Sequence, residues 1–246
     1  MVIPWRLVLL VVKARFGYTL LHKAVKGGFI NIVQFLLERA DIDPNKTDKD
    51  GSTPFDIAAE EERFKIVKLL LERTTIDLKK VYKDGNTVLH KATRSGELEL
   101  VQLLLKTSNI DPNQKNKDGD SVLHIAARCR ELEMVKLLLK TSTVDPNHEN
   151  KDGDAVLHIA ARCGELEMVK LLLKTSNVDP NHENKIDGDT PLHKAVRDKN
   201  LSMVQLLLER GDINPDKVNR FIKENSAAED CVTGAYHTQY KSQHIS

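Results

Sequence analysis

The sequence has few aromatic residues, few cysteines and almost no net charge. Aromatic residues make up 4% of the chain, so stacking platforms for single-stranded nucleic acid are not expected. Lys and Arg number 37 against 36 Asp and Glu, and a nucleic-acid binder usually carries a clear basic excess. Three cysteines cannot form a disulfide framework, which indicates a reducing compartment. No apolar run approaches the roughly 20 residues that a membrane-spanning helix needs.

What the sequence does have is a hydrophobic content of 40% and an internal repeat. That content excludes wholesale disorder. A glycine-containing turn recurs at intervals of 34, 34, 34, 34 and 35 residues, and the last interval is longer because Ile186 is inserted. The recurring glycines are Gly17, Gly51, Gly85, Gly119, Gly153 and Gly188. Self-similarity at a fixed period predicts stacked copies of one small unit.

Each copy reads as a turn followed by two helices. In the third copy, Gly85 belongs to an Asp-Gly turn that tolerates positive φ, and Thr87 is expected to cap a first helix at about 89–94. Gly96 is expected to end that helix in a left-handed conformation, before a second helix at about 97–106. The second helix is apolar on most sides, so neighbouring copies must cover it.

The fullest copy, Asp187 to Ala195, reads Asp-Gly-Asp-Thr-Pro-Leu-His-Lys-Ala, and the second helices share the pattern Val-x-Leu-Leu-Leu. Tetratricopeptide repeats have the same period but need a pattern of Trp and Tyr, and the one Trp of this chain lies outside the repeats. The sequence therefore resembles the ankyrin-repeat family over about residues 14–220. The resemblance implies an all-α repeat solenoid, an ankyrin-type helix-turn-helix stack with β-turn or hairpin loops.

The array is expected to hold six repeats and to have unusual ends. The repeats are expected at about 14–47, 48–81, 82–115, 116–149, 150–184 and 185–220. Residues 1–13 are an atypical apolar segment, which we interpret as a foreign or truncated start that covers the first repeat. A signal peptide is the alternative, but the apolar run 7–12 is short and no small-residue cleavage site follows it. Residues 221–246 are polar and are expected to form a disordered tail.

Departures from the repeat pattern predict local differences in stability. Repeats four and five match at 31 of 34 positions, and Ala155 lacks the N-cap hydroxyl found at the same position in other repeats. Glu62 and Arg130 stand where a left-handed glycine is expected, at a cost on the order of 1 kcal/mol. In the sixth repeat Lys199 has this place, with Asn200 beside it as a tolerable substitute. Repeat two, where Asp56 replaces the His of the other repeats, is expected to be the least stable interior repeat.

No catalytic or metal-binding pattern is found, so we expect no enzyme activity, no metal and no cofactor. His148 and His182 are one period apart, about 10 Å, and cannot share a zinc ion whose bonds are about 2.0–2.1 Å long. Cys129 and Cys163 are separated in the same way and are expected to be free thiols. Five further histidines share one repeat position, where the resemblance implies a structural bond across neighbouring turns: His22, His90, His124, His158 and His193.

A row of basic residues is the best candidate for a binding surface. In ankyrin repeats partners usually dock on the turn tips and on the inner face of the first helix. In this chain one turn position is basic in five of the six repeats, and one first-helix position is also basic in five of the six. We call these residues the basic stripe and expect them to receive an acidic segment of a partner protein. The alternative is a solvated face of mixed charge, because Asp residues flank the turn lysines. The candidate residues are Lys26, Lys83, Arg94, Lys117, Arg128, Lys151, Arg162 and Arg197.

The resemblance thus predicts a non-enzymatic protein-interaction scaffold that binds a partner on the concave face of the array. Alternatives are a regulatory or inhibitor module of an enzyme, a secreted effector of an intracellular bacterium, and a fragment without a selected partner. Nucleic-acid binding is opposed by the net charge and by the interspersed Asp residues. We expect a monomer without membrane association, in the cytoplasm or delivered into a host cytosol.

Overall fold

The computed structural model describes residues 18–107, 110–175 and 177–217, which contain twelve α-helices and no β-strand. The chain divides into two compact parts. We call their described residues the N-terminal block, residues 18–111, and the C-terminal block, residues 112–217. The apolar segment 1–13 and the tail 221–246 lie outside the described residues. None of the described helices is long and apolar enough to cross a bilayer.

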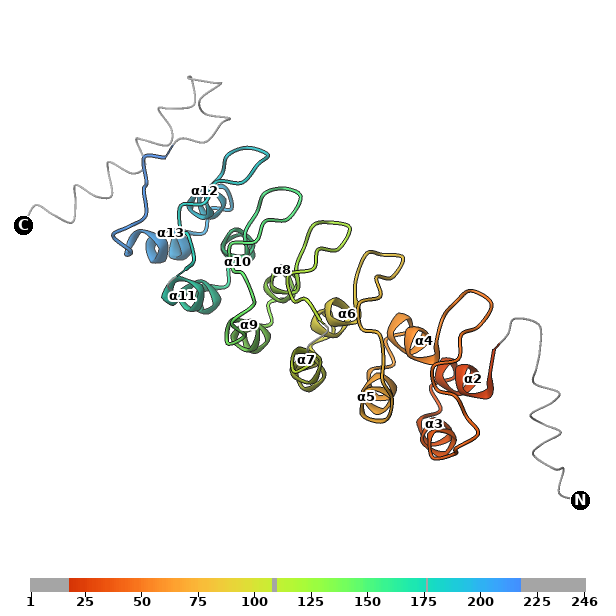
Figure 1. Ribbon diagram of the computed structural model, residues 1–246. Helices are drawn as coiled ribbons and strands as arrows, with labels where there is room; N and C mark the ends of the chain where they lie inside the picture. Colours follow the sequence, from red (N-terminus) through yellow and green to blue (C-terminus); the bar gives the residue numbers. More distant parts are fainter. Residues whose placement is uncertain (1–17, 108–109, 176, 218–246) are drawn as a thin grey trace, which may run out of the picture. The chain divides into compact units, whose positions relative to one another are not determined.

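The N-terminal block is built from three pairs of helices. Within each pair the two helices pack against each other, α2 also packs on α4, and α3 on α5. Figure 1 shows the first helices of these pairs in one row and the second helices in another, with the turns extending beyond the first row. The pairs are α2 (Leu20–Lys26) with α3 (Ile30–Leu37), α4 (Pro54–Glu60) with α5 (Phe64–Arg73), and α6 (Val88–Arg94) with α7 (Leu98–Leu105).

The C-terminal block repeats this arrangement. Helix α10 packs against both α8 and α12, and α11 packs against both α9 and α13. The pairs are α8 (Val122–Arg128) with α9 (Leu132–Leu139), α10 (Val156–Cys163) with α11 (Leu166–Lys174), and α12 (Pro191–Arg197) with α13 (Leu201–Leu208). The predicted fold class, an all-α stack of helix-turn-helix repeats, is confirmed.

Every first helix except α10 begins at a Thr or Ser N-cap, and α10 begins at Ala155. The Thr87 hydroxyl lies 2.8 Å from Nδ1 of His90, and the Thr87 backbone N–H donates to the same nitrogen. This confirms Thr87 as the N-cap, with the helix at 88–94 instead of 89–94. In repeat two, Asp56 takes the place of the histidine and accepts from the backbone N–H of Thr53 at 2.7 Å. The helix start therefore survives the substitution.

Each first helix ends at a left-handed residue, which turns the chain back into the second helix. Gly96 has φ 71°, as predicted, and Glu62 and Arg130 keep this geometry with φ 54° and 63°. In the sixth repeat the left-handed residue is Lys199, with φ 55°, and not its neighbour Asn200. Asn200 instead caps the next helix, because its side-chain oxygen accepts from the backbone N–H of Met203 at 3.1 Å.

The core lies between the two rows of helices. Second helices contribute large side chains that are fully buried, such as Leu104 and Leu138. First helices contribute an alanine at the same position of every described repeat, such as Ala92 and Ala126, which are 0% exposed. Removing each Leu from water contributes about 1.5–3 kcal/mol, and the small alanines let neighbouring first helices approach closely. The helices are thus held by their neighbours more than by their own length.

The turns are closed by a backbone bond, and in the C-terminal block they are also joined to one another. Asn116 donates its N–H to the carbonyl of Asp120 at 3.0 Å, which confirms the predicted β-turn loop. The N–H of Lys151 donates to Asp118 of the preceding turn at 3.1 Å. This approach requires Gly119, because a Cβ there would lie 2.5 Å from the Lys151 nitrogen.

Candidate protein-interaction surface

All eight residues of the basic stripe are exposed, and they occupy two kinds of place. Lys26, Arg94, Arg128 and Arg197 are the last residues of their first helices, and Arg162 is the last but one. Lys83, Lys117 and Lys151 lie in the turns. A cation at a helix C-terminus also offsets the helix dipole, so the arginines stabilise the helices that they end.

The arginines of the C-terminal block are paired with buried carboxylates of their own repeats. Arg128 donates to both oxygens of Asp120, which is 0% exposed. Arg162 lies 3.7 Å from the carboxylate of Asp154, which is also buried. Arg197 likewise forms ion pairs with carboxylates of its own turn. These arginines therefore compensate charges inside the repeat.

The buried carboxylates are also bonded from one repeat to the next. The Asn150 side chain donates to Asp120 at 3.1 Å, and Asn184 donates to Asp154 at 3.0 Å. A buried carboxylate is costly unless it is paired and hydrogen-bonded, so each arginine above these aspartates has a structural reason to be there.

In the sixth repeat, basic side chains compensate the charge of the Asp187 carboxylate and lower its pKa. Burial tends to raise the pKa of Asp187, but the bond from Arg197 and the charge of Lys194 hold it at about 2. Lys194 is itself almost buried and lies within 4 Å of three carboxylates, those of Asp154, Asp187 and Asp189. In the C-terminal block the basic stripe is thus one half of an internal charge network.

The basic residues of the N-terminal block lack these partners. The position after the turn glycine, aspartate in the C-terminal block, is Tyr18, Ser52 or Asn86 here. Within the described residues Arg94 and Lys83 form no ion pair, and the ammonium group of Lys26 lies 5.8 Å from the ring centroid of Tyr18. Charges without an internal counter-ion are the ones that a partner can neutralise.

One residue of the N-terminal block reverses the sign of the stripe. Glu60 ends α4 at the position that is basic in every other repeat, and it is exposed. No ion pair of Glu60 occurs within the described part of the chain. Lys80 of the next repeat pairs with the buried carboxylate of Asp56 instead of with Glu60, and its ammonium group lies 2.8 Å from the Asp56 oxygen.

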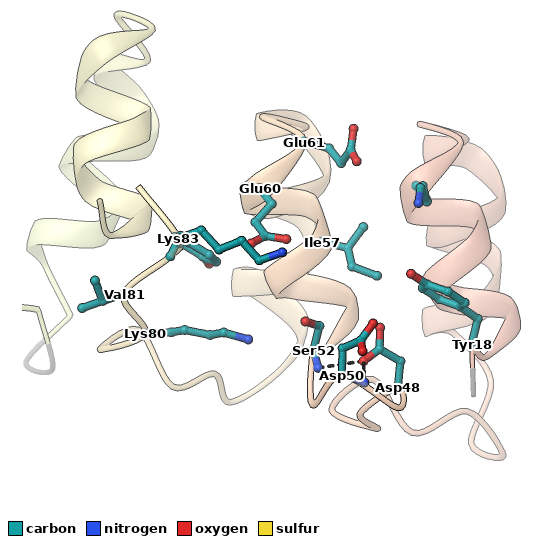
Figure 2. A pocket seen from close by; sticks show the side chains of 12 residues that line it. Tyr18, Asp48, Asp50, Ser52, Ile57, Glu60, Glu61, Lys80, Val81 and Lys83 are labelled. Atoms are coloured by element: carbon teal, nitrogen blue, oxygen red, sulfur yellow. Dashed lines mark hydrogen bonds between the residues drawn. The ribbon is translucent and has the colours of Figure 1, made fainter. Parts of the chain in front are cut away.

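A cavity of about 510 Å³ opens beside Glu60. Figure 2 shows Glu60 and Ile57 of α4 facing it, with Tyr18 on one side and the segment that carries Lys83 on the other. The cavity exists because the turns separate here. A Cβ at Gly51 would meet no atom within 4 Å, in contrast to the crowded turn glycines of the C-terminal block.

The recurring histidines have the structural role that the resemblance implies. The Nε2 atoms of His22, His124 and His158 lie 3.0 Å from backbone carbonyls of the following repeat's turn. Burial is the main cause that lowers the pKa of His124 and that of His158, the latter to about 4. The lowered pKa values favour the neutral imidazole at His124 and His158, and all three rings are already engaged in bonds between repeats.

The other candidates for chemistry are separated in the structure. Cys129 is exposed and Cys163 is half-buried, and no disulfide joins these two cysteines, as predicted. His182 lies 2.9 Å from Glu149, and its ring packs edge-on against that of His158. Between residues 18 and 217, apart from the three undescribed positions, no group of three His, Cys, Asp or Glu side chains is placed to hold a metal ion.

Sequence reasoning found the basic stripe but missed the division within it. The aspartates Asp120, Asp154 and Asp189 were visible as neighbours of the stripe, yet only the structure shows that they are buried beneath its arginines. The cavity had no sequence signal beyond the acidic residues of repeat two. The predicted residues are therefore brought together in two groups with different surroundings, Lys26, Lys83 and Arg94 in one block and the other five in the second.

Comparison with known families agrees with this architecture. The family model for ankyrin repeats matches three times, over residues 6–82, 74–150 and 142–219. A search of curated proteins finds no match to the chain. Together the three matches cover residues 6–219. The chain belongs to the ankyrin-repeat family.

Proposed function

We propose that the chain is a non-enzymatic interaction scaffold whose exposed basic residues bind an acidic segment of a partner protein. Ankyrin repeats generally mediate protein–protein interaction, and the family is generally non-enzymatic. The proposal goes further in assigning the contact to the first-helix and turn surface of the N-terminal block. The observation that carries it is the difference between Arg94, which has no ion pair within the described residues, and Arg128, which is bonded to Asp120.

The ion pairs that the basic residues already form support this choice of block. An arginine already bonded to a buried carboxylate can bind an acidic partner only by sharing or breaking that bond. Lys83 and Arg94 are exposed and form no ion pair within the described residues, so an acidic partner need not break an existing bond to reach them. Exposed pairs are individually worth about 0–1 kcal/mol, so several must act together to give measurable affinity. Lys26, at the end of α2, provides a third such cation in the same block.

Selection from a display library of random twelve-residue peptides on the immobilised full-length chain tests the proposal. We expect enriched peptides to be rich in Asp and Glu. The double variant Lys83→Ser with Arg94→Ser is expected to lose that enrichment. Lys65→Ser with Lys106→Ser removes two exposed lysines from the second-helix side of the same block and is the matched control.

Two results would contradict the proposal. One is enrichment of peptides without an acidic excess by the native chain. The other is unchanged enrichment by the Lys83 and Arg94 double variant. Circular dichroism of each variant shows that the helices are intact before the selections are compared.

A further inference from the structure

Three departures from the repeat pattern coincide at repeat two. The stripe position is acidic at Glu60, the neighbouring turns are separated, and the cavity of about 510 Å³ lies between them. In the C-terminal block, by contrast, Lys185 donates its backbone N–H to Asp152 of the previous turn at 2.9 Å. The corresponding bond from Lys83 to Asp50 is absent from the described residues. Space and reversed charge therefore occur at the same point.

The charges at this point cannot neutralise one another. Packed helices are about 8–10 Å apart, so Lys26 of α2 and Glu60 of α4 lie at roughly that spacing, while Arg94 follows on α6, which packs less closely on α4. The Debye length at physiological salt is about 8 Å, which screens exposed charges at such distances. None of the three forms an ion pair within the described residues. The surface thus presents three separate charges in the order positive, negative, positive.

We propose that this surface selects an extended partner segment in which a basic residue stands between two acidic residues, one of them three positions away. The basic side chain enters the cavity and meets Glu60. The acidic side chain three positions away meets Lys26, and the acidic side chain on the other side meets Arg94. The spacing of three follows from the packed pair α2 and α4, because three residues of extended chain span about 10 Å.

The walls of the cavity suit a long basic side chain. Tyr18 and Tyr82 both line it, and their rings already attract the ammonium groups of Lys26 and Lys91, at 5.8 and 5.6 Å from the ring centroids. Ile57 gives an apolar surface for the methylene stem, and Glu60 offers a carboxylate that no described residue pairs. The cavity also holds Lys80 and Lys83, but Lys80 is engaged by Asp56.

This inference rests on the proposed function, and the same display library separates the two. The native full-length chain is expected to enrich peptides in which a basic residue has acidic residues on both sides, one of them three positions away. Glu60→Arg gives repeat two the residue that four other repeats have, and is expected to shift the central preference from basic to acidic. Titration of one native-selected peptide should then show at least about fivefold weaker binding to Glu60→Arg. Glu72→Arg, the same charge change on an exposed residue of α5, is expected to leave both results unchanged.

The outcomes differ for the two proposals. Acidic peptides with no preference for a basic central residue would overturn the inference and leave the proposed function standing. An unchanged central preference in Glu60→Arg would overturn it as well. Enrichment of peptides without acidic residues would overturn both.

Discussion

Arg128 donates hydrogen bonds to both carboxylate oxygens of Asp120, a buried residue eight positions earlier in the chain. Asp120 also accepts from Asn150 of the following repeat. A surface arginine is thereby connected to the interior of the stack. Arg94 has the same place in its repeat, but there the residue after the turn glycine is the neutral Asn86. One repeat position thus has a buried carboxylate partner in one block and, within the described residues, no ion pair in the other.

We expect Arg128→Ser to lower the free energy of unfolding by about 1–2 kcal/mol, because it leaves the Asp120 carboxylate without its charged partner. The arginine side chain is 44% exposed, so the loss stays below that of a fully buried pair. Arg94→Ser is expected to change stability by less than about 0.5 kcal/mol. Urea denaturation followed by circular dichroism measures both. Equal losses in the two variants would contradict the assigned difference.

The cap of α10 offers a second test of stability. Ala155 is the N-cap residue there, and its backbone N–H donates to Nδ1 of His158 without the hydroxyl that Ser121 adds in the preceding repeat. We expect Ala155→Ser to stabilise the chain by about 1 kcal/mol, since the repeats are nearly identical and Ser121 fits the same buried position. Thermal unfolding measures the effect. A midpoint that stays the same or falls would show that the cap is already satisfied.

The repeat pattern predicted the fold because stacked copies repeat the same local signals. Thr87, Gly85 and Gly96 each specify a cap, a turn or a helix end by local chemistry, and all three act as predicted. The helix ends differ by one residue, since second helices were expected at 97–106 and α7 spans Leu98–Leu105. Such ends depend on capping bonds that composition does not show.

The candidate surface was harder to predict, because its properties depend on what lies beneath each side chain. The sequence shows that Arg94 and Arg128 share a repeat position. It does not show that the carboxylate under Arg128 is buried and bonded across repeats. The separation of turns at Gly51 likewise depends on contacts between repeats, which are not local in sequence. The repeat pattern therefore predicted which basic residues share a repeat position and not which of them are paired with buried carboxylates.

The left-handed backbone at Arg130 leads us to expect opposite changes in the free energy of unfolding from two substitutions. Its φ of 63° is unfavourable for a side chain with Cβ, and the equivalent residue of the next repeat is Gly164, with φ 76°. We expect Arg130→Gly to raise the free energy of unfolding by about 1 kcal/mol, less a small loss from its exposed 3.5 Å pair with Glu165. Gly164→Arg is expected to lower it by a similar amount. Chemical denaturation of both variants measures the two free energies of unfolding. Changes of the same sign in the two variants would refute the backbone explanation.

The buried histidines make stability depend on pH. Desolvation is the main cause that lowers the pKa of His124, His158 and His193 in the folded chain. Their Nδ1 atoms accept from the N-cap backbone N–H, so a proton on that atom would remove the acceptor. A depressed folded pKa means that the unfolded chain binds protons first. The stability is therefore complete above the unfolded pKa of about 6.5 and is lost as pH falls toward the folded pKa, about 4 for His158.

We expect the free energy of unfolding to fall steadily between pH 6.5 and 4.5, with a slope that approaches about 1.4 kcal/mol per pH unit from His158, to which His124 and His193 add in the same direction. The aspartates with depressed pKa values, Asp84 and Asp187 at about 2, lose their contribution only below the ordinary value of 3.8, so they do not explain a change in this range. His158→Gln is expected to be less stable at pH 7 and to show a shallower slope. Urea titrations at several pH values measure both quantities. A free energy that stays constant from pH 7 to 5 would mean that these histidines accept protons in the folded chain as readily as in the unfolded one.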